Sequence, residues 1–147
     1  LGVNQSPYNL LNRHVEEDIV PCCLREEMSV VAYAPLAQGV LTGKYRPGAS
    51  IPENTRAWEN PSPNLAGYLA ETNLEIVQRL GNWSNDAGHP VVDLAIVWLV
   101  ARPFVCSVLT GVTSTAQLEA NVRAIGWHLT EQQMREVEGI VDDREQG

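Results

Sequence analysis

Two glycines and a lysine stand close together in Gly39-Val-Leu-Thr-Gly43-Lys44, shortly after an apolar run at 30–34. Glycine lets backbone N–H groups approach an oxyanion closely, and a lysine ammonium adds positive charge, so this composition suits phosphate binding. The glycine spacing is one residue short of a P-loop, and Tyr45 stands where that motif needs a Ser or Thr. The Gly-x-Gly-x-x-Gly fingerprint of Rossmann domains is absent. Two interpretations therefore stay open: an anion-binding loop or a plain flexible one.

No arrangement of side chains in the sequence indicates catalysis or metal binding. Neither a Ser/His/Asp set nor a pair of carboxylates rises above background. No Cys-x-x-Cys or Cys/His cluster has metal-ligand spacing. We therefore predict no catalytic residue and no metal site. Three histidines lie outside the expected strand ends and are interpreted as ordinary surface or packing residues: His14, His89 and His128.

The composition is that of an ordinary globular chain, with 147 residues, 44% hydrophobic and 19% charged. The net charge of −8 argues against a nucleic-acid groove or an anionic membrane surface as the main partner. The longest apolar run, Leu94 to Ala101, has eight residues, whereas a membrane span needs about 20. An odd number of cysteines, two of them adjacent, disfavours a disulfide framework. We interpret them as small buried hydrophobes in a reducing, cytoplasmic compartment: Cys22, Cys23 and Cys106.

Short extended runs alternate with helical ones along the chain. Apolar residues predict strands at 30–34 and 105–109, and the ambiguous run 1–5 could be a third, closing before Ser6-Pro7. The Pro- and Gly-rich stretch 37–64 is the least regular part, and a loop this long is usually functional or mobile.

Helices are expected between these strands and after them. Acidic residues and Pro21 predict one over 16–27, and periodicity predicts others near 76–83 and over 91–101, the last buried on nearly all sides. Two capping boxes, Ser114 with Gln117 and Thr130 with Gln133, start the final helices. The first of these has the apolar stripe Leu118, Val122 and Ile125. The order of strands and helices predicts a parallel α/β architecture.

Several strings together resemble the carboxyl-terminal part of an aldo-keto reductase, in the branch that includes the potassium-channel β-subunits. The most specific is the string from Tyr33 through Ala-Pro-Leu-Ala-Gln-Gly-Val-Leu-Thr-Gly to Lys44-Tyr45. It is followed by Thr55-Arg56-Ala57 and then by Gly111 with Gln117 and Asn121. The resemblance covers essentially the whole chain. It implies a (β/α)₈ barrel that binds NADPH without a Rossmann fold and reduces aldehydes and ketones.

The resemblance also implies roles for individual residues. Gln5 would hydrogen-bond the nicotinamide carboxamide, and Tyr33 would stack on the nicotinamide ring. Lys44 would pair with the pyrophosphate, and the guanidinium of Arg56 would hold the 2′-phosphate. The other cofactor-binding residues would follow the pyrophosphate or hold the adenosine end: Ala34, Pro35, Leu36, Ala37, Gln38, Gly39, Gly111, Thr113, Gln117 and Asn121.

Four of these residues also have ordinary structural interpretations. Tyr33 could be a half-buried strand aromatic, and Gln117 could simply close its capping box. Arg56 could be a solvated loop charge, and Asn121 a surface helix residue. In addition, Ala120 stands where the family usually has an acidic residue, which leaves the choice between NADPH and NADH open.

The family's catalytic Asp, Tyr, Lys and His lie on strands before the part of the barrel that this chain resembles. A (β/α)₈ barrel takes about 250 residues, so we expect a fragment whose three strands correspond to strands six, seven and eight. Its open strand edges predict pairing with the missing half of the barrel or with another copy of the chain. Three functions remain: the cofactor-binding part of a reductase of small carbonyl substrates, a non-catalytic nucleotide-binding regulatory module, or a remnant that binds nothing.

Overall fold

The computed structural model describes residues 2–143 of the chain. The strands and helices, in chain order, are β1 (Val3–Pro7), the 3₁₀ helix η1 (His14–Glu16), α1 (Ile19–Arg25), β2 (Ser29–Tyr33), the 3₁₀ helix η2 (Ala37–Thr42), α2 (Arg56–Glu59), α3 (Pro63–Tyr68), α4 (Glu71–Asp86), α5 (Val91–Val100), β3 (Val105–Leu109), α6 (Thr115–Ala124) and α7 (Glu131–Asp142). None of these helices is both long and apolar enough to cross a bilayer.

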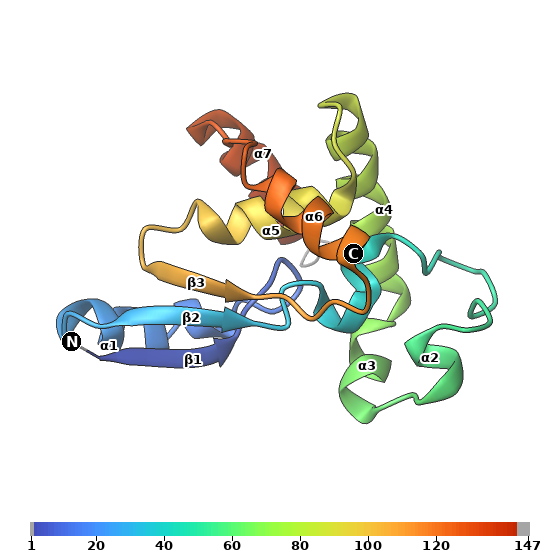
Figure 1. The fold of residues 1–147 in the computed structure, drawn as a ribbon, viewed down its shortest axis with the longest axis horizontal. Coiled ribbons are helices and arrows are strands. Elements are labelled where there is room, and N and C mark those ends of the chain that lie inside the picture. The colour runs from blue at the N-terminus through green and yellow to red at the C-terminus, as the bar shows by residue number, and fades with distance from the viewer. Residues whose placement is uncertain (1, 144–147) are drawn as a thin grey trace.

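The three strands form one parallel sheet with β2 in the centre. β1 pairs with β2 from Val3 opposite Ser29 to Pro7 opposite Tyr33, and Tyr33 in turn lies opposite Leu109 of β3. All three strands therefore end at the same edge, where the chain continues into η2 and into the loop before α6 (Figure 1). Among the described residues β1 and β3 each pair with β2 only, so the two outer edges of the sheet are open. The predicted parallel α/β architecture is confirmed.

The predicted strand at 105–109 matches β3, and the one at 30–34 differs from β2 by one residue. β1 extends to Pro7, two residues beyond the run 1–5. Proline can end a strand because it has no N–H to donate, and the next N–H, that of Tyr8, bonds to the Tyr33 carbonyl at 3.2 Å. The strand therefore continues its pairing past the proline that the sequence marks as a stop.

The single helix predicted over 16–27 is wrong, because the chain forms η1 and then a separate α1. Asp18 is the residue before α1, so the acidic side chains precede that helix instead of filling its first turn. Pro21 lies in the first turn, where its missing N–H removes no intrahelical hydrogen bond. Glu27 has a φ of 53°, a left-handed conformation that prevents the helix from continuing.

Helix α5 forms the centre of the core. Val91 and residues 94–99 are buried, and Trp98 is completely inaccessible to solvent. α5 packs against β3, α4, α6 and η2, so nearly its whole circumference is covered. This confirms the buried helix that its apolar composition predicts. Helix α7 adds Val137 and Val141 to the same core, after the predicted capping box of Thr130 and Gln133.

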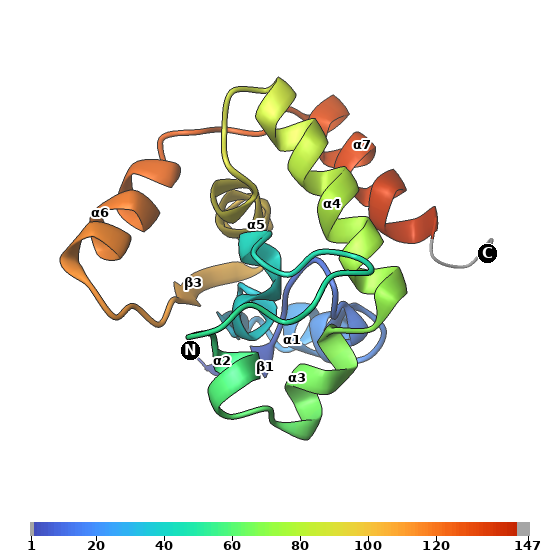
Figure 2. The same ribbon diagram turned by 90° about the vertical axis from the view of Figure 1, so that its right-hand side faces the viewer.

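The apolar stripe of α6 is not buried. Leu118, Val122 and Ile125 are 48%, 61% and 48% exposed. α6 instead buries Asn121 and Ala124, and its main neighbour is α5. Figure 2 shows α6 on the side of the molecule opposite α4 and α7, with no other described element beside its outer face. The buried face that this apolar stripe predicts is therefore wrong, and no described residue covers it.

The cysteines also differ from expectation. Cys23 is buried, as predicted, but Cys22 and Cys106 are exposed. Cys22 lies on the outer side of α1, with its sulfur 3.3 Å from a guanidinium nitrogen of Arg25. Cys106 lies on β3, where its sulfur is 3.5 Å from the Val30 carbonyl. Neighbouring side chains point to opposite faces of a strand and lie about 100° apart around a helix, so a run of apolar residues does not make every member buried.

A polar network lies against Trp98 at the amino-terminal side of the core. The Tyr8 hydroxyl donates to Glu16 at 2.6 Å, and the Arg13 guanidinium donates to both oxygens of the same carboxylate. Arg102 lies over the Trp98 ring, 4.2 Å from its centroid. Burial alone would raise the pKa of Glu16, but the hydrogen bonds from Arg13 and Tyr8 and the nearby positive charges outweigh it and hold that pKa below its ordinary value.

This network predicts a loss of stability in acid. Because the folded pKa of Glu16 lies below its unfolded value of about 4.3, its stabilising effect is present above that pH and is lost as pH falls through the folded pKa. Glu16→Gln is expected to lower the free energy of unfolding by about 1–2 kcal/mol at pH 7 and to flatten its decline between about pH 5 and pH 3. Urea unfolding across this pH range measures both effects. Glu17→Gln, at an exposed neighbouring position outside the network, is the control. A decline as steep in Glu16→Gln as in the unaltered chain would contradict this assignment.

Candidate functional site

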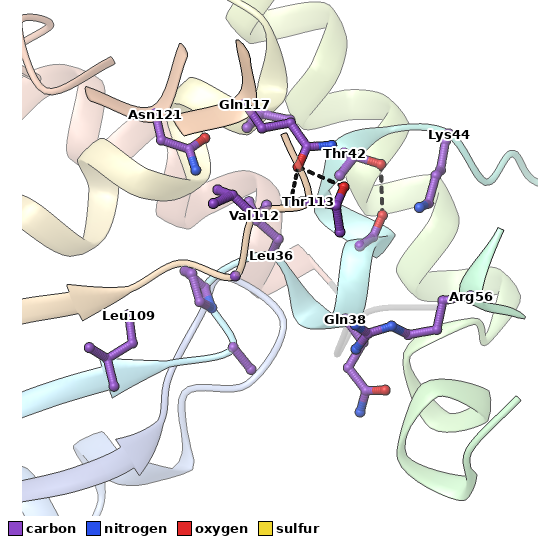
Figure 3. A pocket seen from close by; sticks show the side chains of 15 residues that line it. Leu36, Gln38, Thr42, Lys44, Arg56, Leu109, Val112, Thr113, Gln117 and Asn121 are labelled. Atoms are coloured by element: carbon purple, nitrogen blue, oxygen red, sulfur yellow. Dashed lines mark hydrogen bonds between the residues drawn. The ribbon is translucent and has the colours of Figure 1, made fainter. Parts of the chain in front are cut away.

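A cavity of about 530 Å³ lies at the carboxyl ends of β2 and β3 (Figure 3). We call it the strand-end cavity. Two segments that are far apart in the sequence form most of its wall, one after β2 and one after β3. Its lining residues are Ala34, Pro35, Leu36, Gln38, Gly39, Thr42, Lys44, Arg56, Val92, Leu109, Gly111, Val112, Thr113, Gln117 and Asn121.

Most residues singled out in the sequence meet here. Those that line the cavity are Ala34, Pro35, Leu36, Gln38, Gly39, Lys44, Arg56, Gly111, Thr113, Gln117 and Asn121. The other three, Gln5, Tyr33 and Ala37, do not line it. Ala37 is fully buried in the core, whereas Gln5 and Tyr33 are exposed on the open face of the sheet. Tyr33 lies directly opposite Leu109, a lining residue, so the open sheet face leads to the cavity.

Four lining residues were not predicted: Thr42, Val92, Leu109 and Val112. Thr42 stands inside the glycine and lysine string, and Leu109 ends the predicted third strand, so both carried a usable signal. Val92 lies near the start of α5, far from either motif in the sequence. Only the packing of α5 against η2 brings it to the cavity.

The backbone after β2 turns sharply around the cavity. Ala37, Gln38 and Gly39 have φ values of 46°, 57° and 98°, three consecutive left-handed residues of which only one is glycine. Such conformations cost a non-glycine residue about 1–2 kcal/mol, and here surrounding contacts hold them. The Gly39 N–H bonds to the Leu36 carbonyl at 2.8 Å, and the Ser62 hydroxyl donates to the Gln38 side-chain oxygen at 3.1 Å. The loop is therefore a fixed wall in this structure.

Two cations face the cavity, and no acidic side chain lines it. Lys44 and Arg56 form no ion pair with any carboxylate among residues 2–143, although the chain as a whole carries a net charge of −8. In Figure 3 both side chains lie on the same side of the cavity. Unpaired cations at the rim of a concave site attract anionic ligands. The cavity therefore favours a ligand with phosphate or carboxylate groups.

The opposite wall is polar and belongs to the start of α6. The Gln117 side-chain oxygen accepts hydrogen bonds from the Thr113 N–H at 2.8 Å and from the Thr113 hydroxyl at 3.2 Å. The predicted capping box is thus half correct. The Ser114 hydroxyl does accept from the Gln117 N–H, but the Gln117 side chain holds the backbone of Thr113 instead of that of Ser114.

Asn121 is a polar residue of α6 that is buried instead of exposed. It is only 9% exposed, lines the cavity and has no hydrogen-bond partner among the described residues. Its interpretation as a surface helix residue is therefore wrong. The amide itself is not enclosed but opens into the cavity, where water or a ligand can bind it. Asn121 therefore offers both a donor and an acceptor to whatever occupies the cavity.

The three histidines of the chain lie away from this cavity. His14, His89 and His128 do not line it, and residues 2–143 contain no group of three side chains suited to a metal ion. His89 stacks on Trp127, with ring centroids 4.0 Å apart, and His14 lies 3.3 Å from Glu17 on the surface.

Comparison with known proteins identifies one matching family and several similar proteins. The sequence profile of the Aldo/keto reductase family matches residues 1–142. A protein named probable voltage-gated potassium channel subunit beta, from Arabidopsis thaliana, is 37% identical over 84% of this chain and 38% of its own length. An L-glyceraldehyde 3-phosphate reductase of Escherichia coli is 35% identical over 85% of this chain and 37% of its own.

One solved structure, the glycerol dehydrogenase from Gluconobacter oxydans, aligns with a TM-score of 0.73 and 27% identity. The alignment covers 97% of this chain and 42% of that enzyme. The chain thus spans about two fifths of the length of the relatives that it matches.

Proposed function

Because the chain belongs to the aldo/keto reductase family, we propose that it is the NADP(H)-binding part of an oxidoreductase that reduces aldehydes or ketones by hydride transfer. In this proposal β1, β2 and β3 correspond to strands six, seven and eight of an eight-stranded barrel. Residues outside this chain would supply the catalytic proton donor. On that basis the chain alone would bind the dinucleotide without reducing a carbonyl substrate.

The strand-end cavity carries this proposal. Lys44 and Arg56 are unpaired cations on one side, and Asn121 is an amide without a partner on the other. NADP(H) carries complementary groups. Its phosphate oxygens can pair with the two cations, and the edge of its adenine can both accept a hydrogen bond from the Asn121 amide and donate one to it. The residues present therefore fit the cofactor.

In this proposal each region of the site would hold one part of the cofactor. Lys44 would pair with the pyrophosphate and Arg56 with the 2′-phosphate. The segment from Gly111 to Asn121 would hold the adenosine. The nicotinamide would then lie along the open sheet face, where Tyr33 could stack on it and Gln5 could bond its carboxamide. When bound, the reduced nicotinamide supplies the hydride, and Tyr33 would leave one face of the ring free for transfer.

Titration of the purified chain with NADPH tests the proposal directly. Trp58 stands two residues after Arg56 and is 58% exposed, so its fluorescence is expected to be quenched when the cavity fills. Saturable quenching with a Kd in the micromolar range, about −8 kcal/mol, is the expected result. Calorimetry of the Trp58→Phe variant measures binding without an optical signal. It therefore separates true binding from the absorption of light by NADPH. No binding up to about 1 mM would refute cofactor binding by this chain.

A second candidate function comes from the similarity to proteins named as potassium-channel β-subunits. The chain could be part of a regulatory module that binds NADP(H) without turnover. Both candidates predict the same binding curve for this chain. They differ in a longer protein that contains it, where only the reductase oxidises NADPH when an aldehyde is added, seen as a loss of absorbance at about 340 nm.

A further inference from the structure

Tyr45 lies behind the strand-end cavity. It contacts Lys44 directly, and it also contacts α2, the helix that carries Arg56. Its side chain is 3% exposed and does not line the cavity. Its hydroxyl accepts a hydrogen bond from the Ala57 N–H at 3.3 Å. Its ring lies below the Lys44 ammonium, 5.3 Å from the ring centroid. A single buried side chain thus connects residue 44 with the helix that carries residue 56.

The hydroxyl replaces a missing helix cap. α2 has four residues, Arg56 to Glu59, and a helix this short has little stability of its own. The cap residue Thr55 accepts no side-chain hydrogen bond from the helix, and its hydroxyl donates instead to the Pro52 carbonyl at 2.7 Å. The Ala57 N–H is therefore left to Tyr45. Ala57 is 4% exposed, so water has little access to take over this bond.

The ring acts on the second cation. A side chain added at Gly39 would place its Cβ 3.2 Å from the Lys44 ammonium and 3.3 Å from the carbon next to it. The end of Lys44 therefore passes close to the backbone of Gly39 and faces the ring of Tyr45 on another side. A cation over an aromatic face is stabilised by about 0.5–1 kcal/mol at exposed sites, so the ring favours this one of the many conformations open to lysine.

We propose that Tyr45 is a positioning residue that aligns both phosphate-binding cations of the cavity, its hydroxyl acting on Arg56 through α2 and its ring acting on Lys44. This inference rests on the proposed NADP(H) binding. The two actions are chemically separable, because phenylalanine keeps the ring and removes only the hydroxyl. The hydroxyl acts on Arg56, the residue that would bind the 2′-phosphate. NADPH has this phosphate and NADH lacks it.

Tyr45→Phe therefore has a selective expected effect. It should weaken NADPH binding about three- to fivefold, the loss of roughly one neutral hydrogen bond, while NADH affinity changes less than about twofold. Tyr45→Leu, which also removes the ring, should weaken both nucleotides. In an Arg56→Ala background, Tyr45→Phe should have no further effect on NADPH, because its hydroxyl acts through Arg56. Tyr68→Phe is the matched control, since the Tyr68 hydroxyl bonds to Asn9 and Asn12 and touches neither cation.

A ligand-free measurement keeps the inference testable if the chain binds no nucleotide. Amide hydrogen exchange at Ala57 should be faster in Tyr45→Phe than in the unaltered chain or in Tyr68→Phe. Unchanged exchange at Ala57 would overturn the inference by itself. Equal loss of NADPH and NADH affinity in Tyr45→Phe, with a lowered urea midpoint, would assign the hydroxyl a general structural role instead. Absence of NADPH binding by the unaltered chain would refute the proposed function, whereas normal NADPH binding by Tyr45→Phe would refute only the role of Tyr45.

Discussion

Arg56→Ala is expected to weaken NADPH binding roughly 10- to 30-fold and to leave NADH binding within about twofold. A hydrogen bond to a charged group contributes about 1.5–3 kcal/mol, and 1.4 kcal/mol equals a factor of ten. Arg56 is exposed at the cavity rim, so solvent places its contribution at the low end of that range. Because only NADPH has the 2′-phosphate, the ratio of the two dissociation constants measures this one contact. Parallel calorimetric titrations with the two nucleotides give both constants.

The controls for this experiment use the same residue type. Arg46→Ala removes an exposed arginine that does not line the strand-end cavity, and it should change neither constant by more than about twofold. Arg56→Lys keeps the charge but loses the planar fork that matches phosphate oxygens, so it should recover only part of the affinity. Equal weakening of NADPH and NADH in Arg56→Ala would exclude the 2′-phosphate as its partner.

Trp98→Ala is expected to lower the free energy of unfolding by about 3–5 kcal/mol, the usual cost of removing a large aromatic side chain from a core. Trp98 is fully buried, and its ring packs against Tyr8, with centroids 5.2 Å apart. The indole N–H has no hydrogen-bond partner among the described residues, so the expected loss comes from packing and not from a broken hydrogen bond. Arg102 would also lose the ring below its guanidinium. Urea unfolding followed by circular dichroism measures the effect.

Trp58→Ala provides the comparison, since Trp58 is 58% exposed on α2. Its free energy of unfolding should stay within about 0.5 kcal/mol of that of the unaltered chain. A loss below about 1 kcal/mol in Trp98→Ala would mean that α5 is not the centre of the core. Most small domains have only about 5–15 kcal/mol of stability, so the expected loss is a large part of the total.

The features that the sequence predicts well are those decided by neighbouring residues. β3 begins and ends at the predicted positions, and the capping box of Thr130 and Gln133 forms with both its hydrogen bonds. α5 is buried because almost every residue in it is apolar, whatever direction each one faces. Most of the cavity wall within 34–44 and 111–121 was instead identified through the resemblance to the aldo-keto reductases, and the two segments meet only in the folded chain.

Features that depend on distant contacts were predicted less well. The stripe of Leu118, Val122 and Ile125 is apolar, but periodicity cannot say whether a neighbour covers it. The separation of η1 from α1 was not predicted either. The same holds for the irregular stretch 37–64, where η2, α2 and α3 form. The short α2 there is held through the contact of Ala57 with Tyr45.

Pairing between the two unlike open edges of the sheet restricts the symmetry of the assembly that it forms. β1 and β3 run in the same direction, and within residues 2–143 each has one unpaired side. A β3 edge that pairs with the β1 edge of another copy keeps the parallel hydrogen-bonding pattern, but the two contacting surfaces then differ. Every added copy exposes a new β3 edge. Such an assembly ends only if its strands curve into a closed ring, and otherwise it grows as a filament whose length depends on concentration.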